Sequence, residues 1–246
     1  MMCSEDKKSR IKASMQNTRA RRLNQICKVF ECKIVEKHLN KRQRKELQML
    51  FVEGKWFYNH ILDLHKNVSL TRINTTDIKQ VKRLDKDRNK ISQDLEYLSA
   101  AQKQAIVARM ISNEKTISNL VKKGLQKHGQ LQFKSELNCI PLKQYGHTHK
   151  FKSANKVKIQ GIHGDILVRT GSQLQNVDEL ANANLIRKPD GYYLKVTCFI
   201  NKENFKEQKT NGKEIGLDFG IKTNITTSEG EKLDVTVKES DRLKKL

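Results

Sequence analysis

The spacing of apolar residues changes its period twice along this 246-residue chain, which limits the folds that it can adopt. In residues 28–36, apolar and charged side chains alternate, a period of two that predicts a half-buried strand. Over the next hundred residues, apolar side chains recur every three or four positions, as on helices. After Gly129, short β-forming runs punctuated by glycines return. This order predicts an α+β protein in which a helical insertion interrupts a small β-barrel-like domain.

Three helices are expected within the insertion. The first spans residues 40–62 and opens with an asparagine cap. The second spans residues 75–98, where apolar residues recur at helical spacing. The third spans residues 99–129 and starts with Ser99 and Gln102 in a capping-box pattern.

The charge of the chain indicates a polyanionic partner. Lysine and arginine number 49 against 27 acidic residues, a formal net charge of +22 that is spread along the sequence. No apolar run is long enough to span a membrane, and the first residues lack the apolar core of a secretory signal. The five scattered cysteines fit reduced thiols. We therefore expect an intracellular protein that is not associated with a membrane.

The same patterns divide the chain into six parts. They are a basic N-terminal arm (1–27), a strand (28–38), the helical block (39–135), the rest of the barrel (136–200), a polar linker (201–213) and a C-terminal β segment (214–246). The arm is expected to be disordered or loosely docked, with phosphate contact as the alternative role of its arginines.

The C-terminal segment contains an aspartate on an expected strand. In EIGLDFGIKT the apolar residues Ile215, Leu217, Phe219 and Ile221 share one face, which we expect to be buried in a core. The other face carries Asp218 between two glycines, which leaves room for a metal-bound phosphate. Spacing alone favours the alternative that Asp218 caps a turn or lies on the solvated face of an edge strand. Two further β-rich runs, TNITT and KLDVTV, predict a hairpin or meander.

Candidate nucleic-acid contacts lie in the first expected helix. Its first turns carry four cations where backbone N–H groups also attract anions: Lys41, Arg42, Arg44 and Lys45. They are either phosphate contacts or solvated side chains. Trp56 and Tyr58 flank the apolar stripe, so each either stacks on a base or joins the core.

A second group of candidates follows the helical block. Lys143 and Tyr145 are candidates for contact with an RNA backbone. His147 and His149 alternate on an expected strand and would share a face. Two histidines without a third ligand are weak evidence for zinc.

Six segments carry a resemblance to a known family. They are KVFECKIVEKHLNKRQRKELQMLFVEGKWFYNHIL, IPLKQYG, KVKIQGI, ANANLIRKPDGYYLKVTCF, IGLDFGIKTNITTSEG and ESDRLKKL. Together and in this order they resemble the TnpB family, transposon-encoded RNA-guided nucleases related to the type V CRISPR effectors. The resemblance covers the chain from about Lys28 to its end. It implies a wedge domain with an inserted recognition lobe, followed by the first strands of a RuvC-like (RNase H-type) fold.

By this resemblance, Asp218 is the first carboxylate of a nuclease centre that holds Mg²⁺. Two-metal phosphodiester hydrolysis needs several carboxylates, and the family takes the others from later segments than this chain contains. The zinc ribbon of the family also belongs to those segments. The chain alone is therefore expected to be inactive as a nuclease.

The implied function is that of the N-terminal part of a TnpB-type RNA-guided DNA endonuclease, associated with transposition and DNA recombination. Its implied partners are a structured guide RNA and target DNA, and a separately encoded C-terminal half is a further candidate partner. One alternative is a nuclease-inactive module that binds RNA or DNA, such as a repressor or a gene remnant. Another is a helix-turn-helix DNA-binding protein built on residues 40–98.

Overall fold

A computed structural model describes residues 4–85, 87, 89–127, 129–171, 173–205, 215–220 and 225–233. The chain divides into two compact units, Met1–Phe205 and Lys206–Leu246, and each is described by itself. None of the helices within the described ranges is long and apolar enough to cross a membrane.

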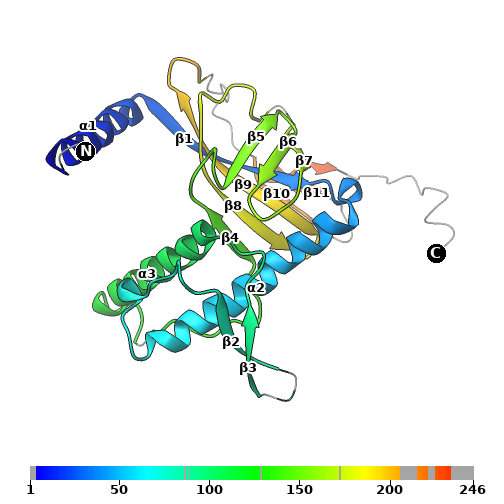
Figure 1. Cartoon of the computed structure of the whole chain (residues 1–246). Helices are drawn as coiled ribbons and strands as arrows, with labels where there is room; N and C mark the ends of the chain where they lie inside the picture. The colour runs from blue at the N-terminus through cyan, green and yellow to red at the C-terminus, as the bar shows by residue number, and fades with distance from the viewer. Residues whose placement is uncertain are drawn as a thin grey trace. The chain divides into compact units, whose positions relative to one another are not determined.

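The large unit is built on a seven-stranded antiparallel sheet with the order β4-β8-β9-β1-β7-β6-β5 (Figure 1). Its strands are β1 (Gln25–Ile34), β4 (Cys139–Leu142), β5 (His149–Ser153), β6 (Lys156–Ile159), β7 (Asp165–Arg169), β8 (Glu179–Lys188) and β9 (Gly191–Asn201). The chain passes directly from β4 at one edge to β5 at the other, and the sheet curls into a nearly closed barrel. The predicted α+β class and the barrel-like sheet are therefore confirmed.

Alternating side chains explain why the long central strands face a core. On β1, Cys32 and Ile34 are buried while Lys33 between them is not. On β9 the buried residues also alternate, from Leu194 through Ile200. Strands β8 and β9 join through a two-residue turn that follows Lys188, as the Pro-Asp-Gly sequence predicts.

Two helices of the insertion start at the capping residues that the sequence predicts. The helix α2 (Lys41–His65) is capped by Asn40, and α3 (Ala100–Lys122) is capped by Ser99; both caps are complete capping boxes. The end of α3 is earlier than predicted, because Gly124 adopts a φ of 69° two residues beyond the last helical residue.

The second predicted helix is wrong: the structure has a hairpin of β2 (Gln80–Leu84) and β3 (Lys90–Asp94), reached from α2 through the short 3₁₀ helix η2 (Leu70–Arg72). Asp85 closes its loop, because its carboxylate accepts a hydrogen bond from the Asn89 N–H at 2.8 Å. The apolar residues before and after this loop are spaced as on one face of a helix, which explains the wrong prediction. Residues 85–89 of the loop are all charged or polar. The helix-turn-helix interpretation thus lacks its second helix.

The N-terminal arm contains a helix that the sequence pattern did not predict, α1 (Ser4–Leu23). Nearly all its described side chains are exposed, so no apolar stripe marks it. Its last turn is docked on the barrel: Arg22 makes two hydrogen bonds to Glu179, at 2.6 and 3.0 Å, and its guanidinium lies 3.3 Å from the centre of the Phe199 ring. The arginines of this turn thus hold the arm to the barrel.

The turn between β6 and β7 joins the insertion to the barrel. Gln43, at the start of α2, donates hydrogen bonds to the carbonyls of His163 and Asp165 at 2.9 and 3.2 Å. At the start of α3, the Gln102 side chain donates to the Gln160 carbonyl at 3.0 Å. Gly161 is required between these contacts, because its φ is +89° and an added Cβ would lie 2.8 Å from a backbone oxygen. Both helices are therefore fixed to one barrel turn.

The predicted pairing of His147 and His149 on one strand face is wrong. Gly146, with a φ of 85°, turns the chain, so His147 lies in an exposed turn and His149 begins β5 with its side chain 1% exposed. The two rings therefore cannot share a zinc ion on a strand face.

His149 should make the barrel less stable in acid. Burial lowers the pKa of its imidazole to about 4, and an interaction with the Ala181 backbone, which raises the pKa, offsets only part of this shift. The Nε2 atom is buried and forms no hydrogen bond of regular geometry with a described residue. The unfolded chain, with a pKa near 6.5, takes up the proton first. The contribution of His149 to the free energy of unfolding is therefore fully present above about pH 6.5. It is lost as the pH falls towards 4, a loss of about 3 kcal/mol.

Urea unfolding at pH 7 and pH 4.5 measures this effect. His149→Phe cannot be protonated and should lose less stability between the two pH values than the wild type does. His147→Phe, at the exposed position, should behave as wild type. Equal losses in all three proteins would contradict the assignment.

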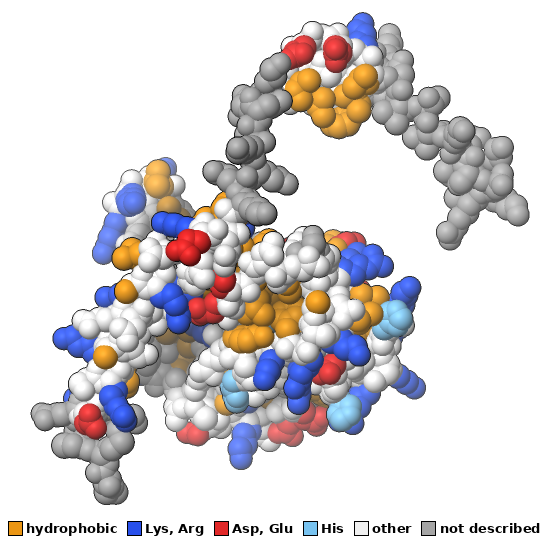
Figure 2. Space-filling view, turned by 90° about the horizontal axis from the view of Figure 1, so that it is seen from above, with side chains coloured by type: hydrophobic (Ala, Val, Ile, Leu, Met, Phe, Trp, Pro, Cys, Tyr) orange, Lys and Arg blue, Asp and Glu red, His pale blue; other side chains and the backbone are white. Residues whose placement is uncertain are grey.

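The described part of the second unit is a meander of β10 (Leu217–Asp218), β11 (Ile225–Thr227) and β12 (Lys232–Leu233), as predicted. The register places Leu217 on the apolar face and Asp218 on the other. The expectation that the apolar face is buried in a core is wrong here: Phe219 is 74% exposed and Leu217 50%. Figure 2 shows hydrophobic side chains gathered on one side of this unit. Ile221, most of the predicted linker and the ESDRLKKL segment lie outside the described residues.

Candidate nucleic-acid interface

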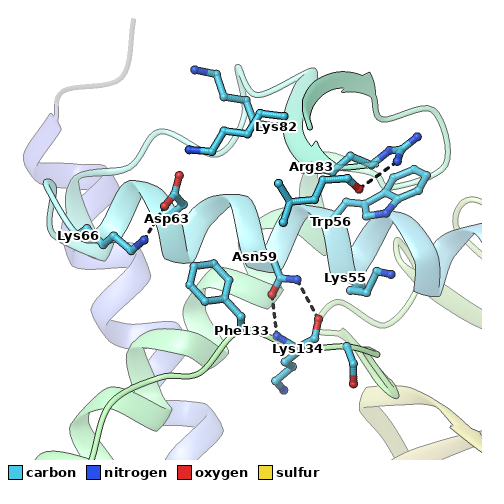
Figure 3. A pocket seen from close by; sticks show the side chains of 12 residues that line it. Lys55, Trp56, Asn59, Asp63, Lys66, Lys82, Arg83, Phe133 and Lys134 are labelled. Carbon is cyan, nitrogen blue, oxygen red and sulfur yellow. Dashed lines mark hydrogen bonds and ion pairs between the residues drawn. The ribbon is translucent and has the colours of Figure 1, made fainter. Parts of the chain in front are cut away.

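A groove of about 440 Å³ lies on the helical insertion, between α2, the β2–β3 hairpin and the segment that leads into β4 (Figure 3). Its volume falls in the range typical of small-ligand sites. The groove is lined by Lys55, Trp56, Asn59, Asp63, Lys66, Lys82, Arg83, Leu84, Lys90, Phe133, Lys134 and Ser135.

One face of α2 forms the floor of this groove. Trp56, Asn59, Asp63 and Lys66 follow one another at steps of three, four and three residues, so they lie along the same side of the helix. The Asn59 side chain donates to the Lys134 carbonyl at 2.9 Å and accepts from the Lys134 N–H at 2.8 Å. This double hydrogen bond fixes the segment containing Phe133 and Lys134 against α2 (Figure 3).

The groove carries a large excess of positive charge. Six lysines and arginines line it, and Asp63 is its one carboxylate among the lining residues. Lys66 hydrogen-bonds Asp63 at 2.8 Å, and this bond is the main reason why the pKa of Asp63 is lowered. None of the other five cations forms an ion pair with a described residue. Without carboxylates to neutralise them in the described part of the groove, these cations produce a local field that attracts anions.

Aromatic rings are interleaved with these cations. The Arg83 guanidinium lies 4.9 Å from the centre of the Trp56 ring, and the Lys66 ammonium lies 5.1 Å from that of Phe133. Phe133 is 55% exposed although it is large and apolar. Neither Trp56 nor Phe133 has an aromatic stacking partner among the residues described. Basic side chains combined with accessible rings are the usual means of binding single-stranded nucleic acid.

Of the two aromatic residues singled out in the sequence, Trp56 lines the groove and Tyr58 does not. Tyr58 is 4% exposed, and burial raises the pKa of its hydroxyl. The Lys134 ammonium lies 4.7 Å from the centre of its ring. Tyr58 thus belongs to the core beneath the groove wall and presents no open ring face to a base.

The basic cluster at the start of α2 lies apart from this groove. Arg42 forms an ion pair with Glu46 at 2.7 Å, and Arg44 donates to the Leu39 carbonyl at 3.1 Å. Burial works to raise the pKa of Glu46, but the hydrogen bond from the His163 N–H and the ion pair with Arg42 outweigh it, so that the pKa is lowered. Both arginines therefore have partners within the fold.

The remaining cations of that cluster and the later candidates are exposed. Lys41 and Lys45 point into solvent on the first turns of α2. Lys143 and Tyr145 lie between β4 and β5, where the Tyr145 ring makes an edge contact with His149, with ring centres 5.4 Å apart. In Figure 2, lysine and arginine side chains are spread over the large unit in the same way. These residues are accessible to a polyanion without forming a pocket.

Asp218 lies on β10, exposed to solvent. In the sheet register it is opposite Thr226, which is opposite Lys232, so the described part of this face carries one carboxylate and one ammonium group. A two-metal centre needs several oxygen ligands around its ions. Among the described residues, no three His, Cys, Asp or Glu side chains are placed to hold a metal ion. The described residues therefore supply one carboxylate, Asp218, to the Mg²⁺ site that the resemblance implies, which stays a prediction.

Sequence reasoning missed most of the groove. Lys82, Arg83 and Lys90 were hidden because the hairpin was expected to be a helix, and Phe133 follows the helical block with no periodic pattern around it. Asn59 stands directly after Trp56, Phe57 and Tyr58 in a segment that resembles the TnpB family, and this position is the sequence signal that could have identified it.

No protein-family model matches the chain, and no curated protein matches it either. The functional conclusion therefore depends on the geometry described above and on the resemblance of short segments.

Proposed function

We propose that this chain is the N-terminal part of a TnpB-type RNA-guided DNA endonuclease, and that it binds a structured guide RNA alongside target DNA. The observation that carries the proposal is the groove on the helical insertion, which is lined by six cations, one carboxylate, the exposed ring of Phe133 and the partly buried ring of Trp56. The barrel with an inserted lobe supports it as well, since the family segments imply that arrangement. A net charge of +22 agrees with a polyanionic partner in the cytoplasm, at the nucleoid.

In this proposal the two parts of the large unit have different tasks. The barrel supports the insertion, because α2 and α3 are both hydrogen-bonded to its β6–β7 turn. The insertion then presents the groove, and exposed lysines elsewhere supply the sequence-independent contacts to phosphates that dominate affinity. Bound RNA would thus be held in one orientation relative to the barrel.

One observation favours a second candidate, a nuclease-inactive RNA-binding module. On the described part of the small sheet, Lys232 shares the face of Asp218, and an ammonium group there opposes the binding of divalent cations. An assay that combines the chain with a separately encoded C-terminal half, its RNA, target DNA and Mg²⁺ distinguishes the two candidate functions. Cleavage that depends on Asp218 supports the nuclease, and its absence favours the module.

Affinity for structured RNA should fall steeply with salt. If the six groove cations each neutralise one phosphate, the plot of log K against log salt concentration should have a slope of about −4 or steeper. RNA that co-purifies with the chain, once sequenced and transcribed, is the ligand for filter binding across a salt series. A flat salt response, or co-purified RNA with no common structured sequence, would contradict the proposal.

A further inference from the structure

We propose that the groove between α2 and the β2–β3 hairpin is a binding site for one unpaired nucleotide, whose base stacks on Phe133. This inference deepens the proposed function and depends on it only for the identity of the polymer. The step from a basic surface to a nucleotide site depends on the rings, their exposure and the way in which the protein holds them.

The exposed ring of Phe133 contributes less to the stability of the fold than a buried ring would. Its ring is 55% exposed on a segment without regular structure, so about half of the stabilisation that burying a phenyl ring provides is not obtained. Yet the backbone of its neighbour Lys134 forms two hydrogen bonds with the Asn59 side chain, donating one and accepting the other, so the position of this segment is defined. A fixed, exposed ring within a groove is a platform for a planar ligand.

The charges around the ring select the rest of the ligand. Lys82 and Lys90 line the same groove without ion pairs to described residues, and ammonium groups there attract the phosphates that flank a stacked base. Trp56 forms a further wall, with Arg83 over its ring at 4.9 Å. A planar base between anionic phosphates matches this combination of rings and cations.

The concave shape favours an unpaired nucleotide over a duplex. A base within a helix is stacked on both faces by its neighbours, so its ring faces are closed to a protein side chain. Proteins stack aromatic residues on bases in loops, bulges and single strands, and they read duplex RNA through its backbone. Phe133 and Trp56 would be unused by a duplex lying across the groove.

The single tryptophan of the chain provides a direct probe, because Trp56 lines the groove. Titrating the full chain with a single-stranded octanucleotide, as RNA and as DNA of the same sequence, should quench Trp56 fluorescence. Polyphosphate of equal charge carries no bases, so it should bind without comparable quenching. Equal quenching by polyphosphate, or by a blunt duplex, would overturn the proposal. The RNA and DNA titrations show whether the site distinguishes the two sugars.

Phe133→Ala should weaken octanucleotide binding about tenfold or more, the loss expected when a stacked base loses its aromatic platform. Leu125→Ala removes another exposed apolar side chain and should leave binding unchanged. Phe133→Trp keeps a platform and should restore binding, which separates stacking from a change in folding. If Phe133→Ala binds as wild type, the nucleotide site is refuted. If the octanucleotide binds as expected but no structured RNA co-purifies, only the proposed function fails.

Discussion

Replacing Glu53 with alanine should lower the free energy of unfolding by about 4 kcal/mol, the largest single-residue loss that we expect in this fold. Glu53 lies on α2 with its side chain 1% exposed. Its carboxylate accepts hydrogen bonds from the N–H groups of Glu96, Tyr97 and Leu98, at 2.8, 2.8 and 2.9 Å. The alanine variant leaves three donors without their acceptor, and each buried, unpaired donor costs about 1–3 kcal/mol.

Glu53→Gln tests whether the carboxylate is needed. The amide keeps one acceptor oxygen but turns an NH₂ group towards backbone donors, so we expect about half of the loss. Glu96→Ala removes an exposed carboxylate from the same segment and should change stability by less than about 0.5 kcal/mol. Urea denaturation of the three variants measures these values. A loss below 1 kcal/mol for Glu53→Ala would show that water or a local rearrangement satisfies the three donors.

Glu53 also shows why one element was wrongly predicted. The segment that it holds joins the hairpin to α3, and its three hydrogen bonds come from 43 to 45 residues further along the chain. Local spacing at Val81 and Ile91 is compatible with a helix, yet both residues are β-branched. In the hairpin, Val81 lies opposite Gln93 and Ile91 lies opposite Arg83. Tertiary contacts decide between a helix and the hairpin here, and such contacts cannot be predicted from the local sequence pattern.

The helix starts could be predicted because their signal is local. Asn40 and Ser99 each bond a backbone N–H three residues away, within one turn of chain. The groove, in contrast, is assembled from three segments that are distant in sequence. Asn59 meets Lys134 across 75 residues, so neither residue reveals the other before the chain is folded. The exposure of Phe133 likewise depends on the tertiary structure and cannot be predicted from the local sequence.

Reversing three groove charges should weaken RNA binding by about a thousandfold at moderate salt while leaving the fold as stable as before. Lys55, Lys82 and Lys90 line the groove and form no ion pairs with described residues. Substitution of all three by glutamate removes three phosphate contacts and adds three repulsive charges. The same change relieves repulsion within the groove, so the free energy of unfolding should be equal or slightly higher.

A variant with the same total charge separates the groove from the general field of the protein. Lys150, Lys152 and Lys158 are exposed on β5 and β6, and their substitution by glutamate alters the net charge by the same six units. Filter binding of the co-purified RNA over a salt series compares the two. The groove variant should lose two to three units of the salt slope, about 0.7 to 0.9 for each contact removed, and the barrel variant less. Equal losses would show that only the overall charge attracts RNA. A stable groove variant that binds as tightly as wild type would remove the groove from the interface.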